Sequence, residues 1–212
     1  MPLVYQQNIN EATKLAVWHI TESEDFFLKK VMLSNAITHP HKRLQHLAGR
    51  YLLTELYENF PLELIKIADT KKPFLTNEAF HFSISHCGDY AAAIASKTNR
   101  VGVDIEVISE KIERIRDKFL SAEEQKMVSG ITNTQHTRSN AQMLTLAWGI
   151  KETIFKWYGS GGVDFREHMH IKNISLRNNE FIAQCEFVKN ETVDLRPHGL
   201  IFNNNFLTWL VT

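Results

Sequence analysis

Two carboxylates, Asp104 and Glu106, lie within a short alternating segment, residues 101–107. Strict alternation of hydrophobic residues predicts a β-strand with Val101, Val103, Ile105 and Val107 on one face. Asp104 and Glu106 then share the opposite face, about 6.5–7 Å apart along the strand. Two neighbouring anions repel each other unless a cation lies between them, and Mg²⁺ usually binds carboxylate oxygens together with substrate phosphates. The alternative is a solvated, charged face on an edge strand.

A third carboxylate lies on the strongest helical pattern of the chain, residues 142–158. Glu152 and Lys156 fall on a partly polar face of this helix, together with Trp148. A glutamate four residues before a lysine forms a favourable pair within one helix, which is one interpretation of both residues. In the other, Glu152 joins Asp104 and Glu106 at a metal site while Lys156 faces an anionic substrate.

A basic stripe predicts a second charged surface. A helical pattern runs from about residue 40 to 59, and its hydrophobic side contains Leu47 and Leu52. Four basic residues recur at helical spacing on another face: His39, Arg43, His46 and Arg50. They indicate either one wall of a phosphate site or an ordinary solvated face.

The composition excludes several classes of protein. The 212 residues contain 24 Lys and Arg and 24 Asp and Glu, so the net charge is zero. A general nucleic-acid or membrane binder is therefore not expected. Two cysteines without a CxxC spacing argue against a disulfide scaffold or a zinc site. No secretory signal or membrane-spanning run is apparent, which predicts a cytoplasmic protein.

The elements that must position these residues repeat in the two halves of the chain. Each half has a long helix followed by several strands, and the acidic strand begins the second half. We therefore predict an α+β fold of two similar halves, residues 1–99 and 100–212. In each, a long helix packs on a small, mostly antiparallel sheet. Together they form an internal pseudo-dimer that acts as one catalytic unit, with the metal site in the second half.

The acidic strand and the helix that follows it contain motifs that resemble those of a known family. Residues 101–106, VGVDIE, followed by residues 148–156, WGIKETIFK, are similar to the G-x-D-x-E and W-x-x-K-E-x-x-x-K motifs of the phosphopantetheinyl transferases. Residues 82–87, FSISHC, resemble the family's F-x-x-S-H-S segment, and Lys72-Pro73 resembles its G-K-P. The glycine run at residues 159–163 is also similar. The length and the repeated layout resemble the surfactin-synthetase-activating type, a monomeric pseudo-dimer.

Three positions depart from the family pattern. Thr70-Lys71 replaces the glycine before Lys72. Cys87 occurs where the family usually has serine, and Thr153 occurs where alanine is usual. None of the three departures removes a group that the family's chemistry needs.

The resemblance implies a holo-[acyl-carrier-protein] synthase. Such an enzyme transfers the phosphopantetheine arm of coenzyme A to a serine of an apo acyl or peptidyl carrier protein, with Mg²⁺, and releases adenosine bisphosphate. The implied metal ligands are Asp104, Glu106 and Glu152, and the implied catalytic residues are Glu152, Lys156 and His86. Coenzyme A would be bound by Arg43, His46, Arg50, Lys72, Ser85, His86 and Lys156.

Two other functions stay open at this point. A protein of the same fold could bind coenzyme A or a nucleotide without transferring anything. Alternatively, the charged positions could be surface residues of a structural or interaction protein. The presence of Asp104, Glu106, Glu152 and Lys156 together favours the enzyme.

Overall fold

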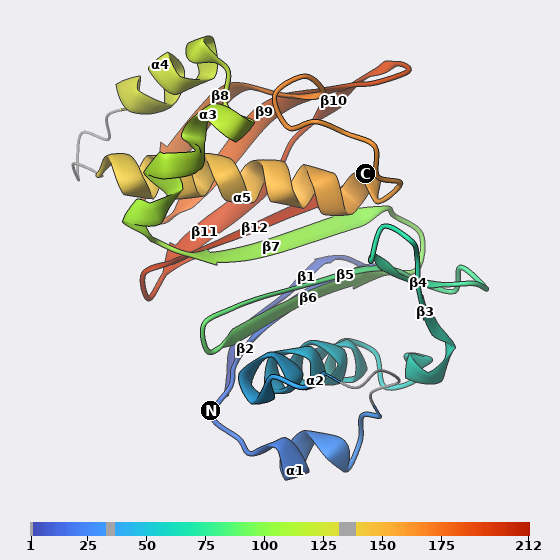
Figure 1. Cartoon of the computed structure of the whole chain (residues 1–212). Coiled ribbons are helices and arrows are strands. Elements are labelled where there is room, and N and C mark those ends of the chain that lie inside the picture. The colour runs from blue at the N-terminus through green and yellow to red at the C-terminus, as the bar shows by residue number, and fades with distance from the viewer. Residues whose placement is uncertain (1, 33–36, 132–138) are drawn as a thin grey trace.

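The computed structural model describes residues 2–32, 37–131 and 139–212. It has a mixed α+β fold with two large antiparallel sheets, each covered by one long helix (Figure 1). The predicted fold class is confirmed.

The first large sheet has the strand order β1-β2-β6-β5, and every neighbouring pair is antiparallel. The long helix α2 (Pro40–Leu56) packs against this sheet and begins with His39 as its N-cap and proline in its first turn. The strands are β1 (Leu3–Asn10), β2 (Thr13–His19), β5 (His81–Cys87) and β6 (Tyr90–Ser96).

The second large sheet has the order β10-β9-β11-β12-β7, with β8 also paired to β9. It is covered by α5 (Asn140–Tyr158), which begins with a capping box at Ser139 and Gln142 and ends at Gly159 in a left-handed conformation. The strands are β7 (Val101–Val107), β8 (Met169–Arg177), β9 (Glu180–Val188), β10 (Thr192–Leu195), β11 (His198–Phe202) and β12 (Asn205–Val211).

Shorter elements connect these layers. A small hairpin joins α2 to the first sheet, and three short helices follow β7. The connecting elements are α1 (Glu24–Leu28), the 3₁₀ helix Leu62–Leu64, β3 (Ile65–Ile67), β4 (Pro73–Leu75), the 3₁₀ helix Glu110–Ile115, α3 (Arg116–Phe119) and α4 (Ala122–Gly130). Among the described helices, none is both long and apolar enough to cross a bilayer.

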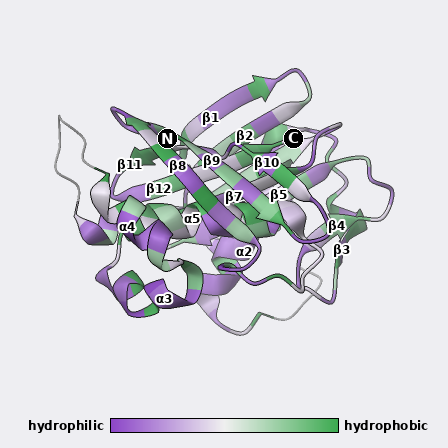
Figure 2. Ribbon diagram, turned by 90° about the horizontal axis from the view of Figure 1, so that it is seen from above, coloured by the Kyte–Doolittle hydropathy of each residue, from purple (hydrophilic) through white to green (hydrophobic). Residues whose placement is uncertain are grey.

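The two sheets meet through a hydrophobic layer of their own, because alternate residues of β2, β6, β7 and β12 face the neighbouring sheet. Figure 2 shows the same alternation as short hydrophobic and hydrophilic bands along strands such as β8. On β7, Val101, Val103 and Ile105 enter this layer, whereas Gly102, Asp104 and Glu106 face α5 or the edge of the sheet. The layer comprises Leu15, Val17, Ala92, Ile94, Val101, Val103, Ile105, Leu207 and Trp209.

Gly102 sets how closely α5 approaches β7. A Cβ atom at this position would lie 2.3 Å from the carbonyl oxygen of Thr153 and 2.8 Å from the amide nitrogen of Trp157. Both are backbone atoms of α5, so no side-chain rotation relieves the contact. The glycine of the first motif therefore allows the strand with the two carboxylates to contact the helix with the third.

Several predicted elements differ in extent. The helix expected at residues 40–59 ends at Leu56, because Tyr57 has an extended backbone. Residues 111–119 have a mixed-charge pattern that is typical of a helix, and they form a 3₁₀ helix followed by the short α3. Residues 131–140 are rich in Thr, Asn and Ser, which predicts an exposed loop, but they lie mostly outside the described residues. Strands β1, β4 and β10 were not predicted. The strands of the first large sheet lie within residues 3–96 and those of the second within residues 101–211, but an internal pseudo-dimer stays a prediction.

Candidate functional site

Asp104, Ser85 and Lys156 meet where β7, β5 and α5 come together. The Lys156 ammonium donates to Asp104 Oδ1 at 2.5 Å and to Ser85 Oγ at 2.8 Å, and Ser85 Oγ donates to the same carboxylate oxygen at 2.8 Å. Asp104 is only 2% exposed. Lys156 therefore makes its ion pair with Asp104 of β7 rather than within its own helix.

Side chains of β5 connect its edge to the edge of β7. The amide of Val103 donates to Ser83 Oγ at 3.2 Å, and the amide of Val107 donates to Cys87 Sγ at 3.4 Å. Ser83, Ser85 and Cys87 alternate along β5, so all three point toward β7. These contacts hold Asp104 and Glu106 at a fixed position relative to β5.

The structure brings all three predicted carboxylates into one region of low polarity. Burial, followed by the charge of Asp104, raises the pKa of Glu106 to about 7 and the pKa of Glu152 to about 7. The ammonium of Lys156 lowers the pKa of both carboxylates, but by less than burial and Asp104 raise it. Such a cluster of carboxylates favours the binding of a cation.

The donors fit a hard divalent cation by their chemistry. Carboxylate oxygens are the ligands that Mg²⁺ takes, usually with waters and phosphates completing its shell. Asp104 Oδ2 is buried and has no hydrogen-bond partner. A buried carboxylate oxygen normally has one, so this atom is free to bind a cation. Within residues 2–32, 37–131 and 139–212, however, no group of three or more His, Cys, Asp or Glu has the arrangement of a metal site. The predicted metal ligands stay a prediction.

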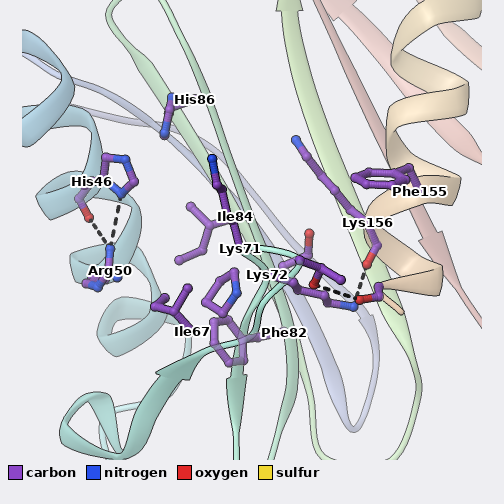
Figure 3. Close-up of a pocket in the computed structure, with 14 residues that line it drawn as sticks. His46, Arg50, Ile67, Lys71, Lys72, Phe82, Ile84, His86, Phe155 and Lys156 are labelled. Atoms are coloured by element: carbon purple, nitrogen blue, oxygen red, sulfur yellow. Dashed lines mark hydrogen bonds between the residues drawn. The ribbon is translucent and has the colours of Figure 1, made fainter. Parts of the chain in front are cut away.

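A cavity of about 250 Å³ opens beside Lys156 and spans the two sheets (Figure 3). Helix α2 contributes His46 and Arg50, and β5 contributes Ile84 and His86. Helix α5 contributes Phe155 and Lys156 from the opposite side. The hairpin of β3 and β4 also lines the cavity, through Thr70, Lys71 and Lys72 of its loop and Pro73 of β4.

The cavity's charge comes from its lysines and its arginine. Burial lowers the pKa of His86 to about 4, with His46 and Lys156 adding to the effect, and burial also lowers the pKa of His46. Both rings, 5.0 Å apart, are therefore neutral at pH 7 in the free protein. Burial lowers the pKa of Lys72 to about 8, and its ammonium donates to the carbonyl oxygen of Lys156 at 2.6 Å. A buried cationic cavity of this kind suits a phosphorylated ligand.

Two predicted ligand-binding residues lie apart from this cavity. Arg43 binds Glu24 through two hydrogen bonds of 2.7 and 2.8 Å, on the side of α2 toward α1. Ser85 lies in the Asp104 cluster and is not among the residues that line the cavity. His46, Arg50, Lys72, His86 and Lys156 do line it.

Sequence reasoning missed some residues of the site. Ser83 and Cys87 connect β5 to β7, and the indole nitrogen of Trp148 donates to Glu106 Oε1 at 3.1 Å. The alternation of β5 could have indicated the first two, because Ser83, Ser85 and Cys87 share one face of the strand. No local pattern indicates that Thr70 and Lys71 line the cavity. They lie in the connection between α2 and β5, and the path of that connection is not encoded by a periodic pattern.

The raised pKa of Glu152 predicts a pH-dependent difference in stability. Between pH 4.5 and 7 the folded protein keeps a proton that the unfolded chain has lost, so stability falls as pH rises through this window. Without metal, we expect Glu152→Gln to match wild type near pH 4.5. At pH 8 it should be more stable by about 1–3 kcal/mol. Urea unfolding in EDTA measures this difference.

Glu58→Gln, which changes an exposed glutamate after α2, is the matched control and should follow wild type throughout. If the free energies of unfolding of Glu152→Gln and wild type run parallel from pH 4.5 to 8, Glu152 does not belong to the anionic cluster.

Comparison with known proteins agrees with this geometry. The model of the 4′-phosphopantetheinyl transferase superfamily matches residues 100–199. The chain is 32% identical over 121 residues to the 4′-phosphopantetheinyl transferase AcpT of Salmonella typhimurium, covering 56% of this chain and 60% of that protein. It is 32% identical over 116 residues to the 4′-phosphopantetheinyl transferase psf-1 of Bacillus pumilus, covering 53% and 47%.

The matched part of the chain thus spans about half to three-fifths of the length of these curated relatives. The family match includes β7 with Asp104 and Glu106, and α5 with Glu152 and Lys156. Through residues 100–199, the chain is therefore similar to the 4′-phosphopantetheinyl transferase superfamily.

Proposed function

We propose that this protein transfers the phosphopantetheine arm of coenzyme A to a serine of an apo acyl or peptidyl carrier protein. The observation that supports the proposal most directly is the position of the cationic cavity. It adjoins the cluster of Asp104 and Lys156, because Lys156 belongs to both. A diphosphate bound in the cavity would therefore lie beside the carboxylates.

The cavity residues would bind coenzyme A and neutralise its phosphates. Lys156 and Lys72 are suited to the pyrophosphate, because both ammonium groups lie at the α5 end of the cavity. Arg50 and the imidazoles of His46 and His86 are suited to the ribose phosphate at the α2 end. Phosphoryl transfer depends mainly on such positioning and charge stabilisation. The role of Arg43 as a further ligand stays a prediction.

Glu152 is the proposed general base. A carboxylate with a pKa of about 7 is half deprotonated near neutral pH and is basic enough to accept a hydroxyl proton as the bond forms. The serine oxygen of the carrier protein bonds to the phosphorus that bears the pantetheine arm, and its proton passes to Glu152. The bond from that phosphorus to the bridging oxygen breaks, and adenosine bisphosphate leaves with that oxygen.

Asp104, Glu106 and Glu152 would hold the Mg²⁺ ion. When bound there, it supplies Lewis-acid polarisation and orientation of the diphosphate. The chain's own contribution is to hold Asp104 by Ser85 and Lys156, so that its second oxygen stays available.

The two halves, residues 1–99 and 100–212, would act as one catalytic unit, since the cavity draws residues from both. A monomeric state and a cytoplasmic location stay predictions.

Mass spectrometry of an apo carrier protein tests the proposal. Incubation with the protein, coenzyme A and Mg²⁺ should increase the carrier's mass by one phosphopantetheine arm. An unchanged mass, with the protein stabilised by coenzyme A in a thermal-shift assay, would instead indicate a non-catalytic binding module. No stabilisation at all would favour a structural or interaction protein.

Removal of one cavity charge should weaken coenzyme A binding. We expect Arg50→Gln to raise the dissociation constant for coenzyme A about 10–100-fold, because a hydrogen bond to a charged group contributes about 1.5–3 kcal/mol. Isothermal titration calorimetry measures the constant. Lys42→Gln removes a charge from an exposed position of the same helix and should change affinity little. Equal losses in the two variants would mean that binding responds only to net charge.

A further inference from the structure

The Glu106 carboxylate has one donor on each of its oxygens. The Trp148 indole nitrogen donates to Oε1 at 3.1 Å, and the Cys87 thiol donates to Oε2 at 3.7 Å. The two donors come from α5 and β5, which lie on different sides of β7. The carboxylate is therefore held from two directions while each oxygen keeps lone pairs for another partner.

Both donors are themselves fixed. Cys87 Sγ accepts the amide of Val107 at 3.4 Å, which ties the thiol to β7 just beyond Glu106. The Trp148 ring packs against Phe119 and Phe165, with ring centroids 5.1 and 5.3 Å away. Neither donor can move without disturbing a second contact.

We propose that Cys87 and Trp148 are positioning residues that hold Glu106 in the orientation in which it binds the divalent cation beside Asp104. This inference rests on the proposed function. Carboxylates that bind metals are commonly oriented by hydrogen bonds from surrounding residues, and loss of such a partner typically costs about 10–100-fold in metal affinity. Neither residue contacts the cavity for coenzyme A.

Cys87 offers a conservative test of the same idea. A hydroxyl is a stronger donor than a thiol and can also accept the Val107 amide, so Cys87→Ser keeps both contacts. Cys87→Ala removes both. The inference thus predicts that the serine variant keeps the metal affinity of wild type and that the alanine variant loses part of it.

Direct binding of Mn²⁺ to the full chain, followed by electron paramagnetic resonance in the presence of coenzyme A, tests the inference without measuring activity. We expect Trp148→Phe to weaken Mn²⁺ binding about 10–100-fold. Its affinity for coenzyme A alone should stay unchanged. Phenylalanine keeps an aromatic ring between Phe119 and Phe165, so the variant should fold. Cys87→Ala should weaken Mn²⁺ binding, and Cys87→Ser should not.

Trp157→Phe is the matched control, because Trp157 lies on the same helix and donates to Thr212 Oγ1 at 2.9 Å. It should bind Mn²⁺ as wild type does. If Trp148→Phe and wild type bind Mn²⁺ equally, the positioning role is overturned while the proposed function stands. If wild type binds coenzyme A but no Mn²⁺, the metal-dependent function itself fails, and the positioning role fails with it.

Discussion

Asp104→Asn is expected to lower the rate of phosphopantetheine transfer by at least about 10²–10³-fold while the protein stays folded, and Asp104→Ala should abolish transfer. Asp104 is the carboxylate to which Ser85 and Lys156 both bind, and its other oxygen is buried without a hydrogen-bond partner. It also helps to raise the pKa values of Glu106 and Glu152. Its neutralisation therefore removes a metal ligand and makes Glu152 a weaker base.

Steady-state transfer to an apo carrier protein, with thermal unfolding of the same preparations, measures both parts of this prediction. Asparagine has the shape of aspartate and can still accept from Ser85 and Lys156, so the melting temperature should change by only a few degrees. Asp194→Asn, an exposed position on β10, is the control and should be fully active. A fully active, folded Asp104→Asn protein would mean that the cation is bound elsewhere.

The elements that carry the motifs could be predicted because their signals are local. The alternation at residues 101–107 and the helical pattern at residues 142–158 correspond to β7 and α5. The placement of Glu152 beside Asp104 was one of two interpretations of the helix, and the family resemblance favoured it. Strand β10 has only four residues, and β1 is mostly polar and half exposed at the edge of its sheet, so neither has a clear hydrophobic pattern.

Contacts between distant segments could not be predicted in the same way. On the basic stripe of α2, helical spacing places Arg43 and Arg50 on one face, but it does not indicate that Glu24 of α1 binds Arg43. Nor does it show which end of the stripe reaches the cavity. The connection of β5 to β7 through Ser83 and Cys87 likewise depends on how the two sheets pack against each other. The alternation of residues along one strand does not predict that packing.

Lys151, the lysine directly before Glu152, is expected to determine stability rather than to bind substrate. It is completely buried, and its ammonium donates to Glu124 at 2.8 Å and to the carbonyl oxygens of Phe119 and Phe165 at 2.7 and 2.9 Å. These three acceptors satisfy its three N–H groups. Glu124 in turn accepts the amides of Ser121 and Ile171 at 2.8 Å. One ion pair thus joins α3, α4, α5, β8 and the loop after α5.

Lys151→Met should destabilise the protein by about 3–5 kcal/mol, because it leaves Glu124 as an uncompensated buried charge. For a chain of this size, the melting temperature should fall by about 6–20 °C. Lys126→Met, at an exposed position of α4, should have little effect. The double variant Lys151→Met with Glu124→Gln should recover part of the loss, since the unpaired charge is gone. If the double variant is no more stable than Lys151→Met, the loss comes from the unpaired carbonyl oxygens of Phe119 and Phe165 and not from charge.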